Sequence, residues 1–78
     1  MIFNLQRGKR YRATITLGFV ERLASNDMIA DKFRSAGFKD VSVQGEGGTR
    51  YAEGVWDSED MRPSYPPQIS EVLEIAAG

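Results

Sequence analysis

The sequence contains no cysteine and no histidine, and these two absences exclude several kinds of site. Without thiols there is no disulfide, and a structural zinc site loses its usual thiolate and imidazole ligands. Nucleophilic catalysis of the common kinds also loses its cysteine nucleophile and its histidine base. We therefore expect no enzyme, no metal site and no cofactor.

Long apolar runs are missing as well. No stretch approaches the roughly 18 to 20 residues that cross a bilayer, and the first residues lack the charged and apolar segments of a signal peptide. We expect a chain that is neither exported nor anchored, and that is cytoplasmic by default. Its 78 residues suffice for one hydrophobic core, so we expect a single domain over 1–78.

Charge is divided unevenly along the chain, although the net charge is only -1. Residues 1–39 hold eight Lys or Arg and three Asp or Glu, whereas residues 40–78 hold two and eight. The halves therefore carry net charges of +5 and -6. We expect the halves to lie side by side so that these charges pair; head-to-tail association between copies would use the same asymmetry.

The clearest local signal is the alternation of apolar and polar residues from Tyr11 to Phe19, which predicts a half-buried strand. The residues expected to face the core are Tyr11, Ala13, Ile15, Leu17 and Phe19. The opposite row is Arg12, Thr14 and Thr16. A strand covered on both sides would be continuously apolar, so this row is expected on an open face of the sheet.

A helix is predicted next, because Ile29, Phe33 and Ala36 recur with a period of 3.6 residues. Ser25 or Asn26 can cap its N-terminus, and the glycine after Ala36 can end it. The preceding segment is expected to be a loop or a short first turn; the alternative is a longer helix that starts near Val20.

Two further strands are predicted, at 41–44 and 49–57, joined by a glycine-rich turn at 45–48. The third strand has two rows, and the sequence leaves open which of them is buried. One row is Tyr51, Glu53 and Val55. The other is Arg50, Ala52, Gly54 and Trp56, whose small members could lie under a helix.

The two ends of the chain are less regular. Residues 58–67 form a proline-bearing linker, and residues 68–76 are predicted as a second helix with Ile69, Val72, Leu73 and Ala76 on one face. Residues 1–9 are expected to form an N-terminal arm, or an edge strand at 2–5 that turns into the first long strand.

The predicted order is β-α-β-β-α, an α+β fold with helices on one face of a three- to four-stranded sheet. A right-handed crossover makes the first two long strands parallel neighbours or places one strand between them. The arrangement resembles a truncated ferredoxin-like module that lacks its last strand. We expect the missing strand to leave an exposed edge at which another chain can pair.

From Arg10 to Val55 the chain also resembles the SPOR domain, a small bacterial module that binds denuded peptidoglycan strands. The resemblance rests on the opening strand, on Ala36-Gly37-Phe38 at the end of the helix, and on the returning strand 50–55. It implies glycan binding through residues of the open sheet face, namely Thr14, Thr16, Gln44 and Tyr51. The compact format also resembles small accessory proteins of bacteriophages and prophages.

We expect a non-catalytic binding module that acts by protein-protein association through a free sheet edge and divided charge, with a homo-oligomer expected. The alternatives are peptidoglycan binding and single-stranded nucleic acid binding, the latter through Arg7, Lys9, Arg10 and Arg12 beside Tyr11. The pI of about 5.3 and the acidic third strand argue against nucleic acid.

The candidate binding surface consists of Arg10, Arg12, Thr14, Thr16, Gln44, Tyr51 and Glu53. Tyr51, Val55 and Tyr65 are a further candidate patch, because partly apolar exposed groups often mark interfaces. The alternative is that these three side chains cover the edges of the core.

Overall fold

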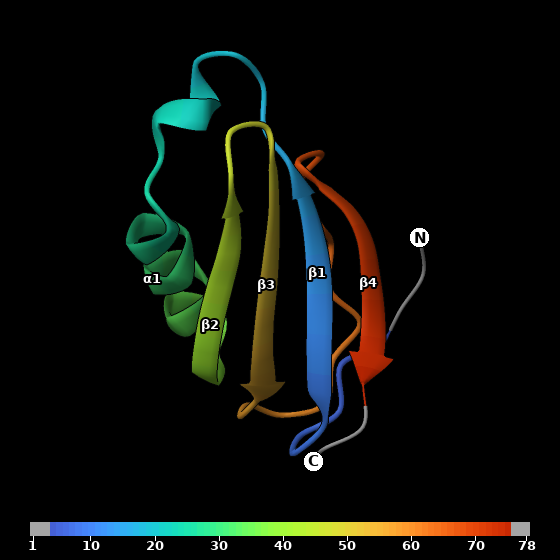
Figure 1. The fold of residues 1–78 in the computed structure, drawn as a ribbon. Coiled ribbons are helices and arrows are strands. Elements are labelled where there is room, and N and C mark those ends of the chain that lie inside the picture. Colours follow the sequence, from blue (N-terminus) through green and yellow to red (C-terminus); the bar gives the residue numbers. More distant parts are fainter. Residues whose placement is uncertain (1–3, 76–78) are drawn as a thin grey trace.

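The computed structural model describes residues 4–75, which form one antiparallel sheet with a helix on one side (Figure 1). The elements are β1 (Arg10–Thr16), a short 3-10 turn (Glu21–Leu23), α1 (Asn26–Ala36), β2 (Phe38–Glu46), β3 (Thr49–Trp56) and β4 (Ile69–Ile75). The strand order is β2-β3-β1-β4. This confirms a small α+β domain whose helix covers one face, and it places β3 between β1 and β2.

The alternation in β1 predicts its two faces correctly over most of its length. Tyr11, Ala13, Ile15 and Leu17 are buried, and Arg12 and its neighbours of the same row face away from the core. The prediction that Phe19 faces the core is wrong, because its side chain is 87% exposed. The strand ends at Thr16 and the chain leaves the sheet in a turn, so the alternation no longer sets the direction of the later side chains.

The helix α1 begins as predicted. Ser25 is its N-cap, and its Oγ accepts a hydrogen bond of 3.1 Å from the Met28 N–H. Gly37 ends the helix with φ of 124°, a conformation that favours glycine. Ala36, predicted on the buried face, is exposed, because it borders an open cleft beside the sheet.

The buried row of β3 is the one that contains Ala52, Gly54 and Trp56. The Phe38 ring lies 4.9 Å from the Trp56 ring and 5.6 Å from Phe33, with edge-on geometry in both pairs. A Cβ on Gly54 would lie 3.3 Å from Phe38 Cβ and from Val41 Cγ2, so the glycine lets β2 pack closely here, and the aromatic trio closes one end of the core.

The glycine-rich segment 45–48 forms the predicted hairpin turn between β2 and β3. Glu46 pairs with Thr49 across the turn, and Gly45 and Gly47 adopt φ of 100° and 70°. A Cβ on Gly45 would lie 2.7 Å from the Thr49 carbonyl oxygen, so this position requires glycine.

The predicted C-terminal helix is wrong, because residues 69–75 form β4, paired with β1. Thr14 pairs with Glu71 and Ile15 pairs with Ile69, so Ser70 has no opposite residue. This extra residue is a bulge that turns Ile69 to the same side as Val72. An apolar spacing of three, which in a regular segment indicates a helix, is here produced by a bulged strand. Ala76 lies outside the described residues.

β4 also corrects the expectation of a missing last strand, since the sheet has four strands and its edges are β2 and β4. Residues 58–67 form a linker with neither helix nor strand, apart from a bridge between Met61 and Leu5. Leu5 is buried against the core. Ile2 and Phe3, part of the predicted edge strand, lie outside the described residues.

Candidate functional site

The residues predicted as a binding surface gather on the open face of the sheet. In the antiparallel register, Tyr51 of β3 lies between Thr14 of β1 and Gln44 of β2. Glu53 lies between Arg12 and Ser42 in the next row. Residues that pair across a sheet project to the same side, so these rows form one polar surface. Arg10 and Thr16 extend it along β1 to the two ends of the strand.

Two arginines, Arg10 and Arg12, hold the Glu53 carboxylate. Arg12 Nη2 and Nε donate to Oε2 at 2.9 and 3.2 Å, and Arg10 Nε lies 3.5 Å from Oε1. The hydrogen bonds from Arg12, with a smaller contribution from Arg10, lower the pKa of Glu53. The open face therefore holds an ionised carboxylate between two cations.

A shallow hollow of about 250 Å³ lies on this surface, lined by Arg12, Ser42, Gln44, Tyr51 and Glu53. Tyr51 is 46% exposed and can present its ring to a ligand. The hollow is smaller than pockets that enclose a whole small molecule, which are about 300 to 1,000 Å³.

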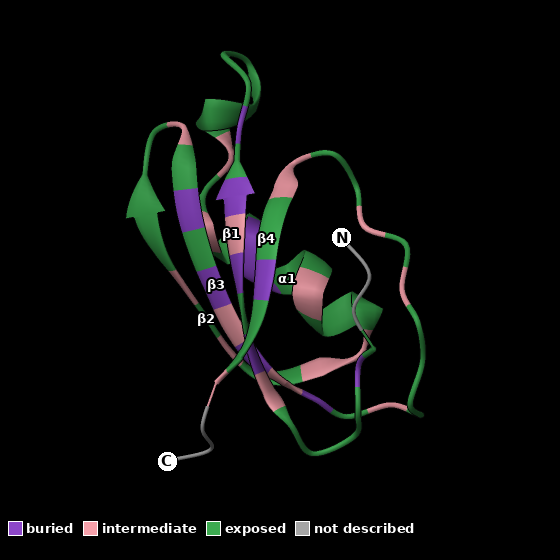
Figure 2. Cartoon of the chain, turned by 90° about the vertical axis from the view of Figure 1, so that its right-hand side faces the viewer, coloured by how far each residue is buried: buried purple, intermediate pink, exposed green. Residues whose placement is uncertain are grey.

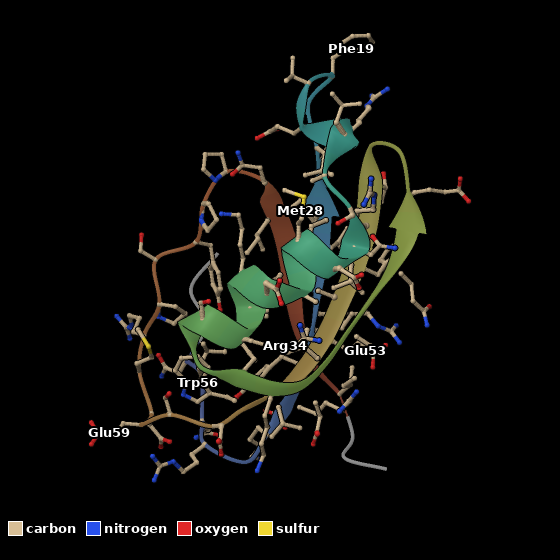
Figure 3. The ribbon with its side chains drawn as sticks, turned by 90° about the vertical axis from the view of Figure 1, so that its left-hand side faces the viewer. Phe19, Met28, Arg34, Glu53, Trp56 and Glu59 are labelled. Atoms are coloured by element: carbon tan, nitrogen blue, oxygen red, sulfur yellow. The ribbon has the colours of Figure 1, made fainter. Side chains whose placement is uncertain are left out.

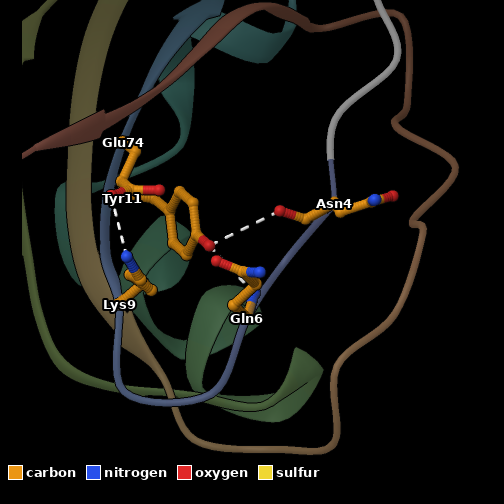
Figure 4. Close-up of polar contacts among 5 residues, drawn as sticks. All are labelled: Asn4, Gln6, Lys9, Tyr11 and Glu74. Atoms are coloured by element: carbon orange, nitrogen blue, oxygen red, sulfur yellow. Dashed lines mark hydrogen bonds and ion pairs between the residues drawn. The ribbon is translucent and has the colours of Figure 1, made fainter.

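Tyr11 is on the other side of the sheet from this surface. Its phenol oxygen accepts a hydrogen bond of 2.8 Å from the Gln6 N–H and lies 3.4 Å from the Asn4 carbonyl, which it can bond as donor (Figure 4). Lys9 Nζ nearby pairs with Glu74 at 3.4 Å. The aromatic expected beside the basic cluster thus ties the N-terminal segment to the core, and Tyr51 is the tyrosine that shares a face with Arg10 and Arg12.

Tyr65 does not join the open-face patch either. It packs against the core cluster that contains Leu5, Tyr11, Trp56 and Val72. Burial raises the pKa of its phenol, and the nearby Tyr11 adds to this shift. Within residues 4–75 its hydroxyl is buried without a hydrogen-bond partner.

An apolar cleft of about 750 Å³ lies on the side of the sheet that carries α1. The helix packs chiefly against β2 and β3, and the linker runs along the inner sides of β1 and β4 (Figure 2). Ile15 and Val72 line the floor, Phe33 of α1 lines one wall, and Tyr65 and Pro66 of the linker line another. Sequence reasoning missed this cleft, because the predicted C-terminal helix would have filled it.

The loop between β1 and α1 carries an exposed apolar tip, formed by Phe19, Val20 and Leu23. Their side chains are 87%, 76% and 87% exposed. Phe19 lies at one extremity of the molecule, pointing away from the sheet (Figure 3). Sequence reasoning assigned Phe19 to the core and did not single out the other two.

A buried arginine fixes the base of this tip. Arg50 of β3 is 5% exposed, and its guanidinium donates to the carbonyls of Arg22 and Ala24 at 3.1 and 2.9 Å and to Asn26 Oδ1 at 2.8 Å. A fourth bond of 3.2 Å reaches the carbonyl of Gly47 in the hairpin turn. The tip is therefore anchored to the sheet although its side chains are in solvent.

Glu21 braces the same loop from its other side. Its Oε1 accepts from the Gly18 N–H at 2.8 Å, and its Oε2 accepts from Gln68 Nε2 at 2.6 Å. These two hydrogen bonds, that from Gly18 first, lower the pKa of Glu21. Gln68 immediately precedes β4, so the tip is tied to the end of the linker as well as to β3.

Among residues 4–75 no group of three or more acidic, histidine or cysteine side chains is placed to hold a metal ion. In the same part of the chain, no helix has the length and apolar character needed to span a membrane. Comparisons of the chain with models of protein families, with curated proteins and with solved structures give no match.

Proposed function

We propose that this chain is a non-catalytic binding module that acts by protein-protein association, with a second copy of itself as the partner. The observation that carries the proposal is the apolar tip of Phe19, Val20 and Leu23, which is anchored by a buried arginine yet exposed to water. Exposed apolar groups that lie together mark interaction surfaces on soluble proteins.

The anchoring matters because association costs conformational freedom. A mobile loop would lose rotational freedom on docking, whereas a loop already fixed by Arg50 and Glu21 loses less. Burying three large apolar side chains stabilises a complex by roughly 5 to 8 kcal/mol. Association itself costs about 4 to 15 kcal/mol. The tip can therefore act as the dominant anchor of an interface but needs a complementary, concave surface opposite it.

Light scattering tests this proposal. We expect the wild-type protein to have a molar mass above the 8.7 kDa of the monomer at about 100 μM, a concentration that populates micromolar complexes. The double variant Phe19→Ser with Leu23→Ser should be monomeric. The matched control is Tyr51→Ser with Leu73→Ser, which removes two exposed apolar side chains from the open face and should keep the wild-type mass. A monomeric wild-type protein would exclude self-association.

A second candidate function is glycan binding on the open face, which the row of Thr14, Tyr51 and Gln44 supports. An exposed aromatic ring flanked by hydroxyl and amide groups can stack on a sugar and bond its hydroxyls. The chain should then co-sediment with purified peptidoglycan, and Tyr51→Ala should abolish this while the tip variant keeps it. Absence of the wild-type protein from the pellet would end this candidate.

We also propose that the architecture is a ferredoxin-like module in which the linker stands where a second helix would lie. The crossover from β1 through α1 to β2, with β3 between them, supports this interpretation. The apolar cleft is then the space of that helix. A chimera with a designed amphipathic helix in place of 58–67 should fold with a higher unfolding midpoint, and a lower midpoint would argue against the interpretation.

A further inference from the structure

We infer that the apolar cleft is the receptor for the tip, so that Phe19, Val20 and Leu23 of one copy insert beneath the linker of a second copy. This inference rests on the proposed self-association and names the surface on the receiving side. It joins two features of the same chain, a protruding apolar group and an apolar hollow.

The cleft is partly open to solvent, has a volume of about 750 Å³ and is lined mainly by apolar side chains. Its floor and walls are core residues such as Ile15, Phe33 and Val72, which gain from contact with apolar atoms. An apolar group is therefore the kind of occupant that this lining binds best.

The tip of another copy supplies such an occupant. It is apolar, it protrudes, and it is present wherever the cleft is present, because the same chain carries both. The tip of the same copy projects outward beside one end of its own cleft: Glu21 and Ala24 of the loop line the cleft, Arg50 and Glu21 fix the base of the loop, and Phe19 points outward (Figure 3). Lys32, which takes part in none of the ion pairs described for residues 4–75, lines the cleft.

The symmetry of the assembly follows from this pairing. The tip and the cleft are different surfaces, so a single tip-to-cleft contact is head-to-tail. Repeated contacts of this kind close into a ring or continue as a chain, and two copies that exchange tips close as a dimer. In every case a copy without a tip can still bind another copy's tip in its cleft. A copy with a filled cleft can still insert its own tip into another copy.

Two complementary variants test this directly. The tip-deleted variant is Phe19→Ser with Leu23→Ser. The cleft-filled variant is Val72→Phe, which places an aromatic ring on the cleft floor; Ala13→Leu, from the adjacent strand, is the second version if the first fails to fold. Filling a cavity tends to stabilise a fold, so thermal unfolding of the cleft-filled protein should show an unchanged or raised midpoint.

Each variant alone should be monomeric, with self-association weakened by at least about 30-fold, the usual effect of losing an interface anchor. An equimolar mixture should form a dimer and go no further, because it contains one intact tip surface and one intact cleft. A cleft-filled protein that still assembles like the wild type would overturn the inference, and so would a mixture that stays monomeric. If tip deletion disrupts assembly but cleft filling does not, the tip docks elsewhere and only the proposed association stands. A monomeric wild-type protein would exclude both the tip-to-cleft contact and the proposed self-association.

Discussion

Arg50 has a role that extends well beyond its own strand, because it joins β3 to the loop at 22–26 and to the hairpin turn. We expect Arg50→Met to lower the free energy of unfolding by about 2 to 3 kcal/mol, since hydrogen bonds from a charged donor are lost and their acceptors lose a partner. Urea denaturation measures this change. Arg50→Lys should restore little of it, because an ammonium cannot reproduce the forked geometry of a guanidinium.

The control for Arg50 is Arg34→Met, which removes an exposed arginine from an ion pair with Asp31 within α1. Exposed pairs of this spacing contribute about 0.3 to 0.5 kcal/mol. Equal losses in the Arg50 and Arg34 variants would contradict the anchoring role. The Arg50 variant should also weaken self-association, because it loosens the base of the tip.

Glu53 makes the stability of the fold depend on pH. Its pKa is lower in the folded protein than the ordinary value of 4.5, chiefly through the hydrogen bond from Arg12. The ionised carboxylate therefore stabilises the fold above about pH 4.5, and this contribution is lost as the pH falls through the lowered pKa. Between about pH 6 and pH 3 the wild type should lose more stability than Glu53→Gln.

The size of this effect is about 1 kcal/mol or less, because the pair is in contact with solvent. Thermal unfolding at several pH values measures it. Arg12→Met should flatten the acid limb as Glu53→Gln does, whereas Arg34→Met should leave it unchanged. Parallel acid limbs for the wild type and Glu53→Gln would rule out this contribution.

For single residues, the sequence predicts the sheet face on which a side chain lies better than it predicts the side chain's hydrogen-bond partners. Alternation places Arg12, Thr14 and Thr16 outward and brings the whole predicted surface to one face, because a strand has a fixed period of two. The partners of Arg50 lie at 22–26 and at 47, and only the folded chain brings them together. The one local hint is an arginine in a row of otherwise small or apolar residues, between Gly48 and Ala52.

Among the elements, β4 shows how a bulge changes the meaning of an apolar pattern. The segment 69–75 has apolar residues three and four apart, the spacing of a helix face. In the structure Ser70 is the bulged residue, its Oγ lies 3.3 Å from the Thr14 carbonyl, and Ile69 and Val72 both face the core. Pairing with β1 determines this conformation, and the local pattern of residues 69–75 does not indicate that pairing.

Strand and helix make different predictions for two adjacent residues. In the predicted helix Val72 and Leu73 both face the core, whereas in β4 Val72 is buried and Leu73 is 48% exposed. We expect Val72→Ser to lower the free energy of unfolding by about 2 kcal/mol, through lost burial of the side chain. Leu73→Ser should change it by less than about 0.5 kcal/mol. Urea denaturation compares them, and equal losses would favour the helix.

Across the whole molecule, the divided charge is paired within the fold. Four of the five ion pairs among the described residues join a cation of the first half to an anion of the second, the fifth being the pair of Arg34 with Asp31. The four are Lys9 with Glu74, Arg10 and Arg12 with Glu53, and Lys39 with Asp57. This confirms the expected side-by-side pairing of the halves. Charge already compensated inside one copy is less available to draw in another, which leaves the apolar tip as the stronger source of association.

Salt therefore separates the two possible origins of self-association. At about 1 M salt the screening length falls to about 3 Å, which removes most attraction between exposed charges. Association through the tip and the cleft should persist or strengthen under these conditions, because burial of apolar surface does not depend on charge. Light scattering at about 0.1 and 1 M sodium chloride measures the molar mass. Dissociation at high salt would assign the interface to the charged halves, and the tip-deleted variant would then assemble at low salt as the wild type does.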